Sequence, residues 1–166
     1  AEFVERGLLL PRGPEAVRAH LDRFIVLTEI VPAMDAPHGA TQPAERLLGC
    51  VALESYGRDL AEVRSLAVRA GEQGRGLGGR LLEAALRTAR RRKIARVFAV
   101  THAPALFERH GFAATTREAV PEKIDRDCND CSKRRRCKLV TLVAVVCPER
   151  VALPVLPVAG KVCVTV

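Results

Sequence analysis

Four glycines fall within the eight residues from Gln73 to Arg80, which read QGRGLGGR. An apolar, β-branched run precedes them, and apolar residues recur behind them at the spacing of one helix face. A helix N-terminus carries unpaired N–H groups and a positive dipole end, and glycines let a ligand approach the backbone closely. The pattern therefore predicts a strand, a glycine-rich turn and a helix that bind a diphosphate. A tight turn that serves only packing is the alternative.

Two common phosphate loops do not fit these residues. No Gly-Lys-Ser/Thr follows the glycines, as a Walker loop requires, and the G-x-G-x-x-G spacing of a dinucleotide site is missing. The stretch does match Gln/Arg-x-x-Gly-x-Gly/Ala, and so resembles the acetyl-CoA loop of the GCN5-related N-acetyltransferases. Residues 60–112 also resemble that family in their order of strand, loop, helix, strand, helix and Gly-Phe.

Softer similarities narrow the resemblance to the short, stand-alone N-acetylglutamate synthases. They lie in AEVRSLAV (61–68), VFAVTH (97–102), FERHGF (107–112) and the cysteine-bearing segment 121–131. The resemblance implies a three-layer α/β (mixed α+β) fold, with a mixed and mostly antiparallel sheet, one parallel strand pair that splays apart, and flanking helices. It also implies direct acetyl transfer from acetyl-CoA to the α-amine of an amino acid, with L-glutamate, the acceptor that opens arginine synthesis, as the first choice.

The resemblance further implies which residues contact the coenzyme. The backbone of residues 66–68 would pair with the pantetheine arm, and residues 73–80 would hold the diphosphate. Phe107 stands where many family members carry a tyrosine that protonates the thiolate, which puts a protein-derived acid in doubt, although the synthases also tend to carry Phe there. The expected coenzyme-binding residues are Leu66, Ala67, Val68, Gln73, Gly74, Arg75, Gly76, Leu77, Gly78, Gly79, Arg80 and Phe107.

Acetyl transfer to an amine requires a group that accepts the amine proton. Glu62, on the strand that leads into the loop, is the leading candidate, and an ordinary surface glutamate is the alternative. His102 is the second candidate because it follows the strand expected at residues 94–101, and His110 is less favoured. No Ser/His/Asp set is visible, as expected for a reaction without a covalent enzyme intermediate.

A glutamate acceptor carries two carboxylates and needs at least two cations nearby. Arg64 is the first choice because strand alternation places it in step with Glu62 and Leu66. Lys123 is second and Arg109 third, although each of these cations taken alone also fits an ordinary surface charge. The expected substrate-binding residues are Arg64, Thr101, Arg109 and Lys123.

The net charge of +8 raises the question of nucleic-acid binding. The sequence contains one Tyr and no Trp, so stacking platforms for bases are scarce, and one basic cluster falls at the end of a helix, where cations suit the dipole. We therefore expect a small-molecule amino-acid substrate and no nucleic acid. Another acceptor, such as a protein N-terminus, a lysine or an amine metabolite, and a non-catalytic basic binding module remain alternatives.

The six cysteines and the lack of a secretory signal predict reduced thiols in the cytoplasm. Cys128, Cys131 and Cys137 have suggestive spacing, but a structural zinc site needs four ligands, and the fourth would be Cys147 or a distant group. We expect no metal, with zinc or a disulfide as alternatives. No apolar run reaches membrane-spanning length, so no membrane is expected, and a homodimer is left open.

The remaining pattern predicts one domain, residues 1–146, followed by an apolar tail of unknown role, residues 147–166. The family usually opens with a strand before its first helices. None is apparent here, and the chain begins at Ala1 rather than Met, so that strand is expected to be missing or to lie upstream. Helices are expected at 14–23, 77–93 and 104–110, with a helix end in 1–10; strands at 24–30, 47–55, 60–68, 94–101, 112–114 and 139–146; loops at 31–44 and over most of 115–138; and a further strand or disorder at 162–166.

Overall fold

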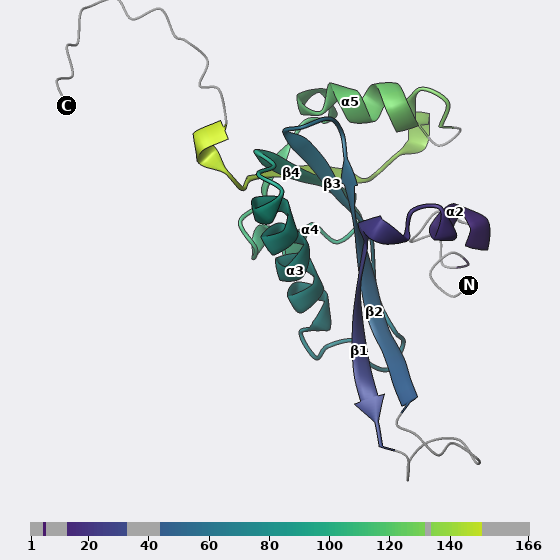
Figure 1. Ribbon diagram of the computed structural model, residues 1–166. Coiled ribbons are helices and arrows are strands. Elements are labelled where there is room, and N and C mark those ends of the chain that lie inside the picture. Colours follow the sequence, from purple (N-terminus) through teal and green to yellow (C-terminus); the bar gives the residue numbers. More distant parts are fainter. Residues whose placement is uncertain (1–4, 6–12, 33–43, 132–133, 151–166) are drawn as a thin grey trace, which may run out of the picture.

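The computed structural model describes residue 5 and residues 13–32, 44–131 and 134–150. Six strands form one mixed sheet in the order β1-β2-β3-β4-β6-β5 (Figure 1). The pair β3–β4 is parallel and the other neighbouring pairs are antiparallel, which confirms the predicted fold class. The strands are β1 (Phe24–Val31), β2 (Ala44–Ser55), β3 (Leu60–Val68), β4 (Arg96–Thr101), β5 (Ala113–Thr115) and β6 (Val140–Val145).

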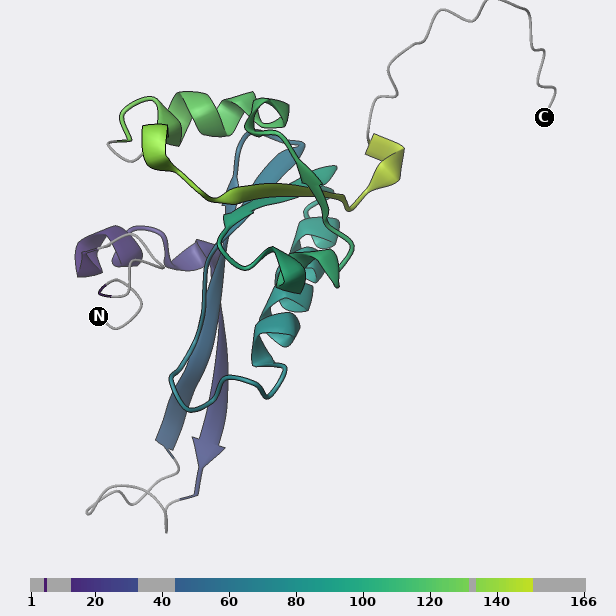
Figure 2. The ribbon, with the colours of Figure 1, turned by 180° about the vertical axis from the view of Figure 1, so that it is seen from behind.

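Helices flank the sheet on both sides, as Figures 1 and 2 show. The long helix α3 (Leu77–Arg91) and the short helix α4 (Pro104–Glu108) lie on one side. The opposite side carries α2 (Pro14–Arg18) and α5 (Pro121–Lys123), which continues as a π-helical turn, Ile124–Cys128. We call residues 121–128 the α5 segment. Short 3₁₀ turns lie at Leu21–Arg23, Arg117–Ala119, Arg134–Arg136 and Pro148–Arg150.

The main core lies between α3 and the sheet. The apolar stripe read from the sequence is the buried face of this helix, which packs against inward-facing residues of β2, β3, β4 and β6. The helix ends where Lys93 adopts a positive φ of 54° and the Ile94 N–H bonds to the Ala89 carbonyl. The buried stripe consists of Leu77, Leu81, Leu82, Ala85, Leu86 and Ala89.

A second, smaller core lies on the other face of the sheet, where Tyr56, Leu60, Phe98 and Val120 pack together. Val120 comes from the stretch at 115–138 that was expected to be mostly loop, and that expectation is wrong for residues 117–128, which are helical. Polar and cysteine residues obscured the helix in the sequence. It forms because Val120 inserts into this core, and because Lys123 and Asp127 pair one turn apart, at 2.6 Å.

A bulge interrupts the pairing of β2 with β3. Cys50 lies opposite Ala67, but Ala52 lies opposite Arg64, so two residues of β3 face one of β2, and Ser65 has a φ of +54°. The bulge reverses the alternation of side chains along β3: Leu66 packs towards the α3 core, whereas Glu62 and Arg64 reach the side of the α5 segment. The expectation that Leu66 stays in step with Glu62 and Arg64 is therefore wrong.

The parallel strands diverge soon after they meet. Pairing of β3 with β4 covers three residue pairs and ends at Glu62 opposite Phe98. Beyond this point β3 follows β2, whereas β4 continues along β6 as far as Thr101 (Figure 2). The divergence follows from the bulge, which bends β3 after Arg64.

The helix expected at 14–23 is divided in the structure, because α2 ends at Arg18 and a separate 3₁₀ turn follows at Leu21–Arg23. The β1–β2 hairpin, α4, and strands β4, β5 and β6 are confirmed, with bounds shifted by one to three residues. Most of the segment 1–10, most of the loop 31–44 and the last stretch 162–166 lie outside the described residues. Within the described ranges, no helix combines the length and apolarity needed to cross a membrane.

Candidate active site

The glycine-rich connection between β3 and α3 has the geometry of an anion site. Gly74 and Gly76 adopt φ values of +81° and +73°, which a residue with a Cβ rarely adopts. Gly76 precedes the helix without offering a side-chain cap, and the Arg80 N–H bonds to its carbonyl. The N–H groups at positions 77–79 come before this hydrogen bond, so they are left for an outside acceptor at the positive end of a 15-residue helix.

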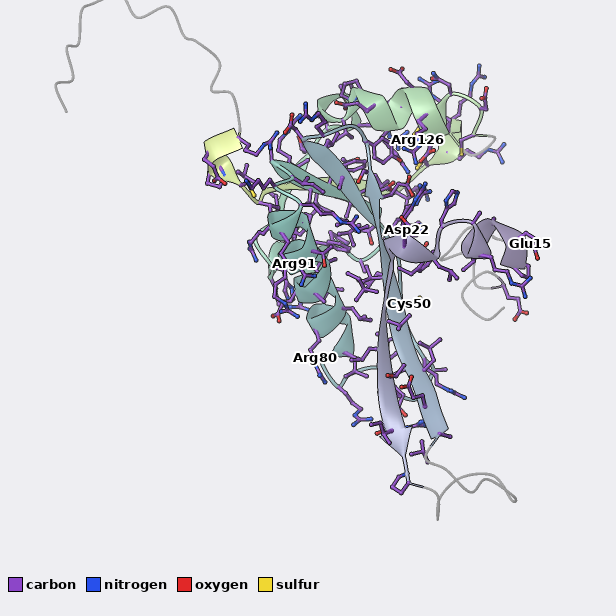
Figure 3. The ribbon with its side chains drawn as sticks, viewed as in Figure 1. Glu15, Asp22, Cys50, Arg80, Arg91 and Arg126 are labelled. Carbon is purple, nitrogen blue, oxygen red and sulfur yellow. The ribbon has the colours of Figure 1, made fainter. Side chains whose placement is uncertain are left out.

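Neighbouring residues fix this loop in place. The Gln73 side chain donates a hydrogen bond to the Val68 carbonyl at 3.3 Å, which ties the loop to the end of β3. A Cβ at Gly79 would lie 3.1 Å from Nε2 of His110, so α3 and α4 approach closely because this position has no side chain. Arg75 pairs with Glu72, and Arg80 is exposed near the start of α3, where Figure 3 labels it.

Residues 66–68 form the last part of β3, beyond the point where it leaves β4. Their side chains are half-buried, and Leu66 and Val68 pack against the α3 core. The register of β3 with β4 has already ended at Glu62, so one edge of this stretch points away from β2 without pairing to β4. Such an edge presents main-chain donors and acceptors to an extended ligand.

A cluster of charged groups surrounds Glu62 at the divergence of the two strands. The Glu62 side chain is 4% exposed, so the interpretation as a surface glutamate is wrong. Lys123 lies 2.9 Å from its carboxylate, the Tyr56 hydroxyl 3.0 Å and the Arg64 guanidinium 3.6 Å. The structure thus brings three residues predicted for the site, Glu62, Arg64 and Lys123, into contact.

Asp127 contacts the same three side chains as Glu62. Its Oδ2 lies 2.6 Å from Nζ of Lys123, 2.7 Å from the Tyr56 hydroxyl and 3.5 Å from Arg64. Burial by itself raises the pKa of the Asp127 carboxyl, but the hydrogen bonds from Lys123 and Tyr56 outweigh it and hold the pKa below its usual value. Burial, followed by the charge of Glu62, raises the pKa of Tyr56, so its hydroxyl stays protonated.

A neighbouring ionic group fastens the α5 segment to β2. Arg126 pairs with the buried carboxylate of Glu54, which also accepts hydrogen bonds from Arg23 at 2.6 and 2.7 Å. Burial opposes ionisation of Glu54, yet its hydrogen bonds with Arg126 and Arg23 lower its pKa. Arg126, labelled beside the α5 segment in Figure 3, also lies 4.2 Å above the Tyr56 ring and donates to the Ser55 carbonyl.

The other predicted site residues lie outside this cluster. Thr101 ends β4 and accepts a hydrogen bond from the Ala103 N–H at 3.0 Å, and His102 is exposed just beyond it. Arg109 is exposed after α4. Phe107 is buried against Phe112, with ring centroids 5.3 Å apart, so its ring belongs to the core and its expected coenzyme contact stays a prediction.

The cysteines form no metal site within the ranges that the structure describes. Cys128, Cys131 and Cys137 are half-buried and free, and no three His, Cys, Asp or Glu side chains in these ranges gather to hold a metal ion. The Cys131 N–H instead bonds to the Cys128 carbonyl as part of a helical turn.

Sequence reasoning missed two members of the cluster, Tyr56 and Asp127. Each carried a weak signal, because Tyr56 is the single tyrosine of the chain and Asp127 follows Lys123 by one helical turn. Neither signal indicated that the two would meet, since they lie 71 residues apart in the sequence.

Comparison with known proteins bears directly on this arrangement. The model of the Acetyltransferase (GNAT) family matches residues 14–112. The chain belongs to the GNAT family. This match runs from α2 to α4 and includes the glycine-rich connection and the strand that carries Glu62 and Arg64. The α5 segment, which carries Lys123 and Asp127, lies beyond the matched residues.

Three relatives set the scale of the similarity. An uncharacterised N-acetyltransferase of Chlorobaculum tepidum is 30% identical over 85% of this chain and 82% of its own length. An amino-acid acetyltransferase of Mycobacterium tuberculosis is 36% identical over 50% of this chain, and one of Neisseria meningitidis is 30% identical over 74%. This GNAT chain spans 48% and 26% of the lengths of those two enzymes.

Solved structures share the fold. An N-acetylglutamate synthase of Neisseria gonorrhoeae, complexed with coenzyme A and N-acetyl-glutamate, is 27% identical, with a TM-score of 0.70 over 87% of this chain and 30% of its own. A Mycobacterium tuberculosis protein, also solved with coenzyme A, has a TM-score of 0.64 at 24% identity, over 87% of this chain and 90% of its own. The chain is thus a GNAT acetyltransferase related to amino-acid acetyltransferases.

Proposed function

We propose that this GNAT domain transfers an acetyl group directly from acetyl-CoA to the α-amine of an amino acid, with L-glutamate as the preferred acceptor. The observation that carries the proposal is the contact of the buried Glu62 carboxylate with Lys123 and Arg64, at the point where β3 leaves β4. It combines a proton acceptor with two cations, which are the groups that acetylation of a dicarboxylic amino acid needs.

Acetyl-CoA fits the main chain of the β3–α3 connection. The free N–H groups at positions 77–79 suit a diphosphate, and the left-handed Gly74 and Gly76 bring the backbone close to it. Arg80 adds positive charge at the start of α3, and Arg75 would add more once it leaves its ion pair with Glu72. The unpaired edge of residues 66–68 would bind the pantetheine arm through main-chain hydrogen bonds.

In this proposal Glu62 accepts the proton of the α-ammonium group, directly or through a water molecule. Its present partners, Lys123 and Arg64, are the cations expected to hold the carboxylates of the acceptor. Substrate binding would therefore exchange one carboxylate for another around these cations. Once Lys123 binds the substrate, the Glu62 carboxylate is released from Lys123. Its oxygen lone pairs can then accept the proton of the amine.

Glutamate is preferred over other acceptors because it brings two carboxylates to two cations. The names of the relatives support an amino-acid acceptor, and the gonococcal synthase was solved with N-acetyl-glutamate. Thr101 and Arg109 stay predicted substrate contacts, and His102 stays the second candidate for the base. We place the reaction at the entry to arginine synthesis, in the cytoplasm.

The leaving thiolate must gain a proton from a group other than residue 107, which is Phe. In our proposal solvent or the ammonium product supplies it. The carbonyl oxygen would accept a hydrogen bond from the Val68 N–H as it becomes an oxyanion. These steps require only main-chain groups near the acetyl carbon, in agreement with the absence of a Ser/His/Asp set from the sequence.

One observation favours a different acceptor. Lys123 and Arg64 already have internal carboxylate partners in Glu62 and Asp127, so the cluster as it stands offers a dicarboxylic acid no unpaired cation. A peptide or small-molecule amine without carboxylates would need no exchange of partners. This second candidate keeps the same donor and the same base.

A thiol-release assay with acetyl-CoA, each of the twenty amino acids, a lysine peptide and an amine without carboxylates tests both candidates. We expect the highest kcat/KM with L-glutamate, and a loss of turnover in Glu62→Gln, with Glu83→Gln on the exposed face of α3 as the matched control. Release with a lysine peptide or an amine without carboxylates, but not with glutamate, would favour the second candidate. Release with none of these acceptors would contradict the proposed activity.

A further inference from the structure

The Tyr56 hydroxyl lies between two carboxylates, 3.0 Å from Oε2 of Glu62 and 2.7 Å from Oδ2 of Asp127. The position of Tyr56 is well fixed. Its ring packs edge-on against Phe98 at 5.3 Å and beneath Arg126, and its backbone N–H bonds to the Leu60 carbonyl at 2.8 Å. The hydroxyl is therefore held between the two acids by its ring and its main chain.

One hydroxyl proton cannot serve both acids at once. Tyr56 can donate to one carboxylate, and its oxygen can only accept from the other. If Tyr56 donates to Asp127, its 3.0 Å contact with Glu62 is a hydrogen bond only when Glu62 carries a proton; if Glu62 is ionised, Tyr56 can turn its proton to Glu62. The direction of the hydroxyl thus follows the protonation state of Glu62.

We propose that Tyr56 and Asp127 form a proton relay that returns Glu62 to its ionised form after each acetyl transfer. The inference rests on the proposed role of Glu62 as the base. Tyr56 and Asp127 act through Glu62, so they orient and reset the base without touching the reacting atoms.

The relay moves one proton from Glu62 to water. The O–H bond of protonated Glu62 breaks as its proton passes to the Tyr56 oxygen, and the original Tyr56 proton passes at the same time to Asp127. Protonated Asp127 then gives its proton to water. Tyr56 ends with one proton and neutral, both carboxylates end ionised, and the net change is one proton released to solvent.

The surroundings of Glu62 favour this route over others. Lys123 and Arg64, which form ion pairs with its carboxylate, are cations and accept no proton. The Glu62 side chain is 4% exposed and that of Asp127 is 25% exposed, so the route runs from the buried acid to one with access to water.

The charged groups around the relay favour proton release from Asp127 to water. Lys123, Arg64 and Arg126 face Asp127 from the α5 segment and from β3, and Arg126 in turn pairs with Glu54 of β2. Hydrogen bonds from Lys123 and Tyr56 overcome burial and lower the pKa of Asp127, so it releases a proton readily. The raised pKa of Tyr56 keeps the hydroxyl neutral between turnovers.

Tyr56→Phe tests the relay because it keeps the ring contacts and removes only the hydroxyl. We expect kcat for glutamate acetylation to fall about tenfold or more, with the KM values of acetyl-CoA and glutamate within about twofold of wild type. Asp127→Asn should likewise lower kcat and leave both KM values nearly unchanged. It is an independent variant in case Tyr56→Phe folds poorly. Unchanged kcat in either folded variant would overturn the relay.

Arg23→Gln is the matched control. It removes a charge from the neighbouring ionic group while Arg126 remains on Glu54 and above Tyr56, and it leaves both relay hydrogen bonds in place. We expect kcat to stay within about twofold of wild type. An equal fall of kcat in Arg23→Gln and Tyr56→Phe would mean that the cluster acts only as a structural support, and would overturn the relay.

Carboxyl NMR separates the relay from the proposed activity. In wild-type protein with ¹³C-labelled Glu and Asp, the carboxyl chemical shifts of Glu62 and Asp127 are followed against pH. Each of the two chemical shifts should show a second step at the pH where the other residue titrates. Tyr56→Phe should reduce this second step, and an unchanged curve would overturn the relay even in an active enzyme. Wild-type protein that shows the coupling but acetylates no amino acid would contradict the proposed function alone.

Discussion

The two ends of β3 carry two different kinds of candidate site. After Val68, the connection to α3 presents main-chain N–H groups, shaped by glycines that lie next to one another in the sequence. Around Glu62, the cluster is made of side chains from the turn after β2, from β3 and from the α5 segment, up to 71 residues apart. A main-chain site of this kind tolerates changes of side chain but not of backbone conformation, whereas the ionic cluster should respond in the opposite way.

The largest expected effect is at the buried carboxylate. Glu62→Gln keeps the shape of the side chain but removes its charge, so kcat should fall about 10²- to 10⁴-fold, the range that a general base contributes. The KM of acetyl-CoA should stay near the wild-type value because the proposed coenzyme contacts lie at the other end of β3. Thiol release measured against both substrates checks this. A kcat within a factor of about three of wild type would remove Glu62 as the base.

Arg64→Ala should have the next largest effect, which is on the KM of glutamate. Loss of a charge-assisted hydrogen bond to a substrate carboxylate costs about 1.5–3 kcal/mol, so the KM of glutamate should rise about 10- to 100-fold. The KM of acetyl-CoA should change much less. Arg58→Ala, in the exposed turn before β3, is the control and should alter neither. An unchanged glutamate KM in Arg64→Ala would remove Arg64 from the acceptor site.

Gly76→Ala tests the glycine-rich connection between β3 and α3. An added Cβ would meet no atom within 4 Å, so the change acts only through its positive φ, at about 1–2 kcal/mol. If the loop must keep this left-handed conformation to hold the diphosphate, the strain opposes binding, and the KM of acetyl-CoA should rise roughly tenfold. Gly57→Ala carries the same kind of strain in an open turn far from the loop, and should lower stability without changing that KM. Equal KM values for both variants would contradict the diphosphate site.

The smallest effect concerns stability at low pH. Asp127 and Glu54 have lowered pKa values in the fold because their hydrogen bonds with cations outweigh burial. Their contribution to stability is complete above the unfolded pKa of about 4, and it is lost as the pH falls through the lower folded values. Thermal melting from pH 7 to pH 3 should show Tm falling below about pH 4, and falling less in Asp127→Asn. An equal fall in both proteins would show that Asp127 adds nothing.

The order of strands and helices was largely readable from the sequence. The β3–α3–β4 unit follows from a β-branched run, adjacent glycines and the apolar stripe of α3, all of which are local patterns. The bulge at Ser65 was not readable, because an ordinary serine takes a positive φ there only through the pairing of β2 with β3. It turned Leu66 to the opposite face from Glu62 and Arg64, against the simple alternation of a strand.

The candidate site was predicted in part. Glu62, Arg64 and Lys123 were named from the sequence, and the structure places them in contact. Their burial and their partners were not predicted, because the sequence between 115 and 138 reads as a polar loop, whereas residues 117–128 are helical and pack on the sheet through Val120. Tyr56 and Asp127 entered the site only through that packing.

The glycine-rich connection before α3 could be predicted from the sequence, since a left-handed glycine turn and the start of a helix depend on a few consecutive residues. The sequence by itself also determined the parallel pairing of the strands on either side of α3, because a strand, helix and strand in succession cross over in that way. The tertiary structure alone decided which charges meet. An ion pair between positions 62 and 123 depends on how a helical segment docks on the sheet, and no spacing in the chain records that distance.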